Sequence, residues 1–88
     1  MSVQANIHPD AKIGKGTVIE AFATVQGDVK IGENCWIGPG ACIMDGARIG
    51  NNVKIGGGSG VVKNIEDNQI VMGYPALPIK EFLKKTKK

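Results

Sequence analysis

Branched aliphatic residues recur at every sixth position along most of the chain. From residue 7 onward, ten consecutive members of this series are Ile or Val without exception. They are Ile7, Ile13, Ile19, Val25, Ile31, Ile37, Ile43, Ile49, Ile55 and Val61. This is the hexapeptide signature of a parallel β-helix, in which each hexad supplies a short strand and a turn.

A second series lies four places further into each hexad and holds smaller residues. Nine of its ten members are small or medium: Ala11, Thr17, Ala23, Val29, Cys35, Ala41, Ala47, Val53 and Ser59, with Ile65 as the last member. We expect three hexads to form one triangular coil, and successive coils to stack at roughly 4.8 Å. The branched residues then fill the interior, and the small ones point inward near the corners.

An 18-residue period supports the three-sided coil. The segments "IGKGTV", "IGENCW" and "IGNNVK" begin at residues 13, 31 and 49. Their fourth positions are Gly16, Asn34 and Asn52, and a neighbouring column contains Asp10, Asp28, Gly46 and Asn64. These residue types tolerate the left-handed backbone of a tight turn, so the corners are predicted to stack.

The stretch "KIGGGSGVV" (residues 54–62) is open to several interpretations. A P-loop requires Lys after the last glycine, and a dinucleotide site requires a helix there; Val61 follows instead. A flexible linker also fits the composition. However, Ile55 and Val61 are six residues apart and Ser59 occupies the small position between them. We therefore predict a wall of the β-helix.

The repeat is expected to stop after Ile65, because the next position in the series is Asp67. We predict one all-β domain: about three and a half coils over residues 1–66, and a closing segment over residues 67–88. That segment is expected to contain a strand at residues 69–72 and a Pro-rich bend. Pro78 then begins a short capping α-helix. The helix has Ile79, Phe82 and Leu83 on one face, for packing on the coils or on a neighbouring chain.

Charge and composition limit the classes of function. The net charge of +3 comes from residues 80–88, which hold five Lys and one Glu, whereas residues 1–79 hold six basic and seven acidic groups. No nucleic-acid motif accompanies this basic tail, which fits a solubilising terminus. Cys35 and Cys42 lack metal-ligand spacing, and the chain has a single His. No long apolar run predicts a membrane span, so a cytoplasmic protein with reduced thiols is expected.

Two aromatic residues indicate self-association. Phe22 and Trp36 occupy hexad positions that should face outward. Large exposed aromatics on a small body mark a contact surface. Because a few coils bury little apolar area, we expect a homotrimer with coils packed side by side.

The chain resembles the hexapeptide-repeat acyltransferases. Residues 6–55, with "IHPDAKIG" and "IMDGARIG", resemble the N-terminal coils of UDP-N-acetylglucosamine O-acyltransferase of lipid A synthesis. Residues 56–83 resemble the closing segment of related sugar and serine acyltransferases. The resemblance implies a left-handed coil, usually in trimers. These enzymes move an acyl group from acyl-carrier protein or coenzyme A to a sugar hydroxyl or amine.

The resemblance also indicates candidate site residues. In the family, a His in a middle coil is the general base, and the donor's pantetheine arm lies between subunits. His8 is the only His here, and it matches the family's first-coil motif instead, so the catalytic residue is unknown. The donor-side candidates are Gly56, Gly57, Gly58, Ser59, Gly60, Gly73, Tyr74, Pro75, Ala76 and Lys80. The alternative is that these residues only turn the chain and pack the cap.

Three functions therefore remain open. The chain is expected to be a shortened, spliced or designed member of the family, serving as a trimeric scaffold without activity, because the coils expected to carry the catalytic His are missing. The second hypothesis is a small active acyltransferase using a UDP-sugar acceptor. The third is a metal site like that of the γ-class carbonic anhydrases, with His8 from three chains. No cofactor is required by the first hypothesis.

Overall fold

The computed structural model describes residues 5–74 and 76–80, which form a solenoid of short strands in three sheets. Sheet 1 contains β1 (Asn6–Ile7), β4 (Thr24–Val25), β7 (Cys42–Ile43) and β10 (Gly60–Val61). Sheet 2 contains β2 (Lys12–Ile13), β5 (Lys30–Ile31) and β8 (Arg48–Ile49). Sheet 3 contains β3 (Val18–Ile19), β6 (Trp36–Ile37), β9 (Lys54–Ile55), β11 (Ile70–Met72) and β12 (Leu77–Pro78).

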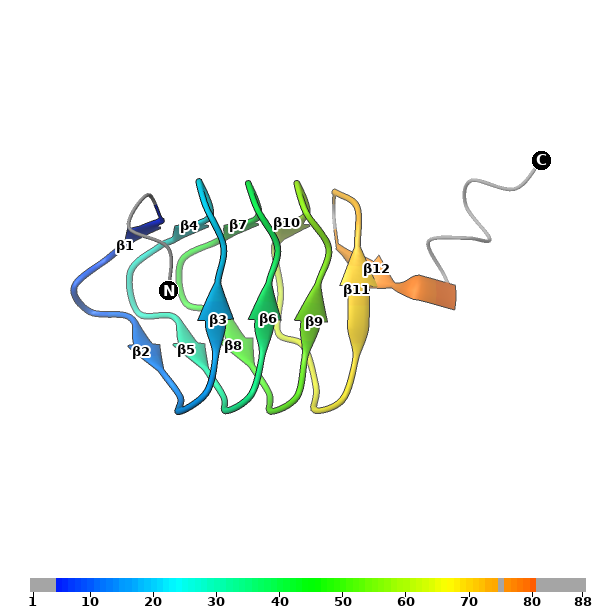
Figure 1. The fold of residues 1–88 in the computed structure, drawn as a ribbon, viewed down its shortest axis with the longest axis horizontal. Helices are drawn as coiled ribbons and strands as arrows, with labels where there is room; N and C mark the ends of the chain where they lie inside the picture. The colour runs from blue at the N-terminus through cyan, green and yellow to red at the C-terminus, as the bar shows by residue number, and fades with distance from the viewer. Residues whose placement is uncertain (1–4, 75, 81–88) are drawn as a thin grey trace.

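The coils wind in a left-handed sense (Figure 1). Strands β3, β6 and β9 ascend on the near face, and the chain returns behind them through β4, β7 and β10 while advancing toward the C-terminal end. Strands of successive coils pair in parallel, eighteen residues apart, as Ile19 does with Ile37. The observed hand is opposite to the usual right-handed crossover between parallel strands. It confirms the hand that the family resemblance implied.

The interior of the solenoid is filled by the two predicted series. From Ile19 to Val61, every branched residue of the six-residue series is at most 4% exposed. The smaller residues of the second series are equally buried: Ala23, Val29, Cys35, Ala41, Ala47, Val53 and Ser59. Ile7 and Ile13, in the first coil, are partly buried and pack against this core. The hexapeptide prediction is confirmed.

Corner residues adopt the left-handed backbone at most of the predicted positions. Gly16, Asn34, Asn52, Asp28 and Gly46 all have φ between 56° and 78°. A third column of such residues was not anticipated from the sequence, and it consists of Phe22, Gly40 and Gly58. Phe22, with φ of 63°, is an unusual side chain for this conformation.

The repeat does not stop at Ile65, which corrects the expectation from the sequence. Ile65 forms a parallel bridge with Ile49, and Val71 pairs with Ile55. Both pairs are sixteen residues apart, because the corner between Val61 and Ile65 is two residues shorter than the others. After this shortened corner, Ile65 and Val71 continue the branched series, and the solenoid has a fourth coil.

The closing segment agrees with the sequence prediction in part. The expected strand is present as β11, and a turn follows at Gly73. Pro78, in contrast, does not begin a helix: it lies in β12, which runs antiparallel to β11. An edge strand tolerates Pro because the missing N–H is not needed by a further strand. Helical backbone begins at Ile79, and Phe82 and Leu83 lie outside the described residues.

The three outer faces differ in chemistry. Sheet 2 presents a column of cations in register: Lys12, Lys30 and Arg48. Sheet 3 presents an apolar column broken by one cation: Val18, Trp36, Lys54 and Ile70. Val18, Trp36 and Ile70 are between 37% and 47% exposed. Beside sheet 1, Met44 and Val62 are exposed to a similar degree. Exposed apolar side chains therefore lie on sheet 3 and beside sheet 1.

Candidate functional site

The glycine run forms the corner between sheets 3 and 1, as predicted, and is not a linker. Gly56 follows β9, Gly57 and Gly58 make the turn, and Gly60 begins β10. A Cβ on Gly57 would lie 3.2 Å from the carbonyl oxygen of Pro39 in the preceding coil. A Cβ on Gly58 would meet no heavy atom within 4 Å. The φ of 70° thus favours glycine at position 58, and this residue borders open space.

Hydrogen bonds join this corner to the closing bend. The N–H of Gly60 donates to the carbonyl of Gly73 over 2.9 Å, and the N–H of Ala76 donates to the carbonyl of Gly60 over 2.7 Å. The buried Ser59 hydroxyl accepts a hydrogen bond from the N–H of Gly73 over 3.2 Å. The two predicted parts of the donor site, at residues 56–60 and 73–76, are therefore neighbours in space.

The close approach that Gly60 permits is made by Tyr74 of the same chain. A Cβ on Gly60 would lie 2.6 Å from Cδ2 of the Tyr74 ring, so the ring packs directly on the glycine backbone. Tyr74 is nevertheless 76% exposed, because its other face is open to solvent. Among the glycines of the run, Gly58 rather than Gly60 leaves room for a ligand.

The remaining donor-side candidates are less well defined. Lys80 is exposed in the short helical stretch that begins at Ile79. Pro75 lies outside the described residues. The role of the whole set in donor binding stays a prediction.

His8 lies at the other end of the solenoid, just after β1. Its Nδ1 accepts a hydrogen bond from the N–H of Asp10 over 3.0 Å, and its imidazole lies over Gly27. The side chain is 47% exposed and borders a surface hollow of about 470 Å³ with Asp28 and Asp45. Within residues 5–74 and 76–80, no three His, Cys, Asp or Glu side chains are grouped as metal ligands.

His8 and the glycine corner lie in different coils, far apart along the axis of the solenoid. His8 belongs to the first coil, whereas Gly56 to Gly60 connect the third coil to the fourth. At roughly 4.8 Å per coil, the two lie on the order of 10–15 Å apart along the solenoid. The structure therefore does not bring the only imidazole to the candidate donor site.

Part of the apolar surface was missed at the sequence level. Val18 and Ile70 are in register with Trp36 on sheet 3, and the indole Nε1 of Trp36 donates to the Glu20 carboxylate over 2.9 Å. The sequence does contain a signal for these positions, because the residue directly before each branched aliphatic residue points outward from the strand. For Ile70, a regular six-residue count does not predict an outward position, because the corner between Val61 and Ile65 is two residues shorter than the others.

Comparison with known proteins identifies the repeat. The family model described as bacterial transferase hexapeptide (six repeats) matches residues 28–63. No curated protein sequence matches the chain significantly. In the part of the chain that the structure describes, no helix has the length and apolarity required to cross a lipid bilayer.

Several solved structures with this fold are acetyltransferases. Serine acetyltransferase from Neisseria gonorrhoeae is 27% identical over 85% of this chain and 40% of its own length, with a TM-score of 0.64. Its complex with serine is 28% identical over 85% of this chain and 42% of its own length, with a TM-score of 0.62. A GDP-perosamine N-acetyltransferase variant from Caulobacter crescentus, in complex with CoA and GDP-perosamine, is 21% identical over 86% and 53%, with a TM-score of 0.60. The chain thus spans about half or less of the length of these structures.

Proposed function

We propose that this chain, which is a hexapeptide-repeat protein with a left-handed β-helix fold, is a trimer-forming module of the acyltransferase type that does not transfer an acyl group by itself. The observation that carries this proposal is the position of its only imidazole. A general base must lie within hydrogen-bond reach of the acceptor's proton. His8 is about three coils away from the candidate donor site.

Assembly into a parallel trimer does not remove this separation. Rotation about an axis parallel to the solenoid carries each residue around at the same height. A His8 imidazole of any subunit therefore stays at the N-terminal coil, while Gly58 of every subunit stays near the last coil. The axial offset applies within and between subunits.

The distribution of apolar side chains supports the trimer. A closed ring of three subunits needs two different complementary patches on each chain, whereas a two-fold dimer needs one patch that pairs with itself. Sheet 3 offers Val18, Trp36 and Ile70, and the ends of β7 and β10 in sheet 1 are followed by Met44 and Val62. Sheet 2, with its cation column, is left facing solvent. This division fits a ring that uses two faces of each β-helix.

Donor binding is a separate part of the proposal. A solved structure with this fold contains CoA, and serine is bound to another. In this chain, the open space beside Gly58 is where the pantetheine arm of CoA or of acyl-carrier protein would lie against the backbone. Lys80, which is exposed two residues after β12, would supply a positive charge for a phosphate group. The acceptor and the link to lipid A synthesis remain proposals from the sequence resemblance.

A transfer assay tests the lack of activity. The chain is incubated with acetyl-CoA or acylated acyl-carrier protein and a UDP-sugar or serine, and product is followed by mass spectrometry. We expect no product above the rate without protein. Product that disappears in His8→Ala would support the alternative of a small active acyltransferase. Zinc bound at one ion per three chains, and lost in the same variant, would support the metal-site alternative.

Sedimentation velocity tests the trimer. We expect the unmodified chain to sediment as a trimer at micromolar concentration and Trp36→Lys to sediment as a monomer, because the substitution places a charge in the centre of the sheet 3 patch. Lys30→Glu, on the solvent-facing sheet 2, is the matched control and should remain trimeric. A monomeric unmodified chain, or a trimeric Trp36→Lys, would contradict the proposed interface.

A further inference from the structure

Lys54 interrupts the apolar column of sheet 3. It lies in register between Trp36 and Ile70, and its side chain is exposed. Neither of the two ion pairs in the described part of the chain includes Lys54. An ammonium group on a face that packs against another subunit loses hydration, which costs free energy unless the charge gains a partner. In the proposed trimer, Lys54 therefore needs a partner outside its own sheet.

Tyr74 presents one face of its ring to solvent. The other face packs on Gly60 in sheet 1, and the residue remains 76% exposed. Hydrogen bonds hold the chain on both sides of the ring, from the N–H of Gly60 to the carbonyl of Gly73 and from the N–H of Ala76 to the carbonyl of Gly60. The open ring face is therefore a fixed feature of the sheet 1 surface.

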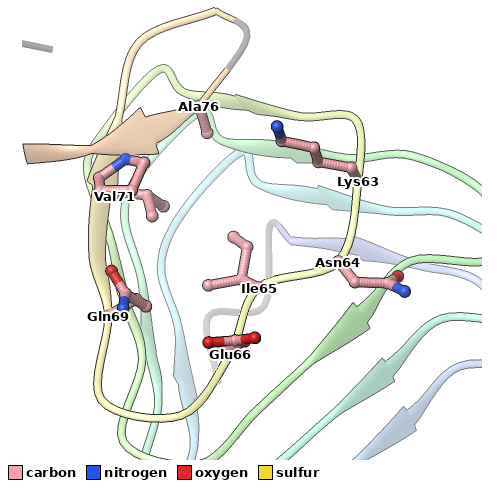
Figure 2. Close-up of a pocket in the computed structure, with 8 residues that line it drawn as sticks. Lys63, Asn64, Ile65, Glu66, Gln69, Val71 and Ala76 are labelled. Atoms are coloured by element: carbon pink, nitrogen blue, oxygen red, sulfur yellow. The ribbon is translucent and has the colours of Figure 1, made fainter. Parts of the chain in front are cut away.

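Ala76 anchors this bend to the core. Figure 2 shows Ala76, Ile65 and Val71 pointing toward one hollow of about 330 Å³ in the last coil. Ala76 is buried there. Moving the bend away from sheet 1 would expose Ala76 and break both hydrogen bonds at Gly60. Tyr74 thus keeps its place on Gly60.

In a ring of three parallel subunits, Lys54 and Gly60 lie at almost the same height. They are six residues apart, one third of an eighteen-residue coil, which corresponds to a rise of roughly 1.6 Å at about 4.8 Å per coil. Rotation about the trimer axis leaves the height of each residue unchanged. Lys54 of one subunit therefore meets sheet 1 of the next subunit at the level of Gly60 and of the Tyr74 ring that covers it.

The distance from the trimer axis matches as well. Sheets 3 and 1 share the corner at Gly58, and this corner faces the axis when sheet 3 of one subunit packs on sheet 1 of the next. Lys54 lies four residues before Gly58, whereas Gly60 and Val62 lie two and four residues after it. Lys54 is therefore opposite the stretch from Gly60 to Val62 of the partner subunit.

We infer that Lys54 of one subunit lies against the open ring face of Tyr74 of the partner subunit, as a cation–π pair that occurs three times in the trimer. This inference rests on the trimer of the proposed function. The electron-rich face of an aromatic ring attracts an ammonium group, and the attraction is stronger where water is excluded. The methylene chain of the lysine covers apolar surface at the same time. The pair gives both exposed side chains a partner.

The same geometry one coil earlier supports the pairing. Trp36 lies four residues before Gly40, and Met44 lies four residues after it. The same rotation therefore places Trp36 opposite Met44 of the partner subunit. The two residues are almost equally exposed, at 37% and 38%, and a thioether packs favourably against an indole ring. One rotation thus provides partners for both Trp36 and Lys54.

Cross-linking with a short bismaleimide tests the pairing. In a Cys42→Ser background, Lys54→Cys/Tyr74→Cys should give three chains joined in a covalent ring on a denaturing gel, because each subunit is linked to the next. Lys30→Cys/Tyr74→Cys, with one cysteine on the solvent-facing sheet 2, is the matched control and should give no such ring. Chains that sediment as trimers but form no covalent ring would overturn the pairing and leave the proposed trimer intact. An unmodified chain that sediments as a monomer would overturn both.

A double-mutant cycle on the trimer dissociation constant gives a second readout. Lys54→Gln should raise this constant at least about tenfold more in the unmodified chain than in a Tyr74→Leu background, because three pairs are lost per trimer. Lys54→Arg and Tyr74→Phe keep the cation and the ring, and both should stay close to the unmodified chain. Lys30→Gln on sheet 2 is the control for a change of net charge. Equal effects of Lys54→Gln in the two backgrounds, measured by sedimentation equilibrium, would overturn the inference.

Discussion

Ile65 forms a parallel bridge with Ile49, sixteen residues earlier in the chain. Every other pair of branched residues up to Val61 is eighteen residues apart, as Ile31 and Ile49 are. The two-residue difference lies in one shortened corner, and it places Ile65 rather than Asp67 in the interior. The fourth coil depends on this shift.

The two-residue shift of the buried series at Ile65 leads to a prediction for Ile65 and Asp67. Ile65→Ala should lower the free energy of unfolding by about 2–4 kcal/mol, because it leaves a cavity at the end of the core. Asp67→Ala should cost only about 0.5–1 kcal/mol, since the exposed carboxylate loses one hydrogen bond from the N–H of Asn51. Urea denaturation followed by circular dichroism measures both. A larger cost for Asp67→Ala would contradict the assigned phase.

The left-handed backbone of Phe22 predicts a stabilising substitution. Phe22 has φ of 63° and is 69% exposed, so it bears backbone strain with little packing inside its own chain. Phe22→Gly should raise the free energy of unfolding by about 0.5–1 kcal/mol, the relief of strain being partly offset by the greater freedom of glycine in the unfolded chain.

The measurement is best made in a Trp36→Lys background, where association does not contribute. Gly58→Ala, at the same corner two coils further on, is the control. Its φ of 70° makes alanine unfavourable, and a loss of about 1 kcal/mol is expected. Destabilisation by Phe22→Gly in this background would show that the phenyl ring has a packing role within the chain.

The Thr17 hydroxyl connects two coils and should be important for stability. The Thr17 O–H donates to the carbonyl of Gly32 over 2.7 Å, and its oxygen accepts from the N–H of Cys35 over 3.1 Å. Thr17→Val keeps the shape but leaves both backbone groups without a partner, at a cost of about 1–3 kcal/mol. Thr17→Ser keeps the hydroxyl and should cost less than 1 kcal/mol. Thermal denaturation of the two variants distinguishes a hydrogen-bond effect from a loss of volume.

The contact between Gly60 and Tyr74 predicts non-additive substitutions. Gly60→Ala should lower stability by about 1 kcal/mol or more, because the new methyl group would lie 2.6 Å from the tyrosine ring. In the Tyr74→Ala background the same substitution should cost at least 0.5 kcal/mol less. Equal costs in the two backgrounds would show that the ring does not restrict this position.

The solenoid follows from the amino-acid sequence alone. A strict period of six in branched residues can bury all its members only if each hexad supplies one side of a three-sided coil, and Gly16, Asn34 and Asn52 mark a corner in each coil. The outward position of Trp36 follows from the same count. These features depend on neighbouring residues and recur in successive coils, so the sequence pattern is sufficient to predict them.

The features that break the repeat depend on contacts between segments that are distant in the sequence. The shift at Ile65 became visible only through its pairing with Ile49, because a corner two residues shorter looks like the end of the pattern. The covering of Gly60 by Tyr74, and the axial distance between His8 and the glycine corner, depend on which coil each residue reaches. Local preference favours Pro78 at the start of a helix, but in the structure Pro78 lies in β12, which pairs with β11. Contacts between distant segments set these outcomes, and a local count of residues does not contain them.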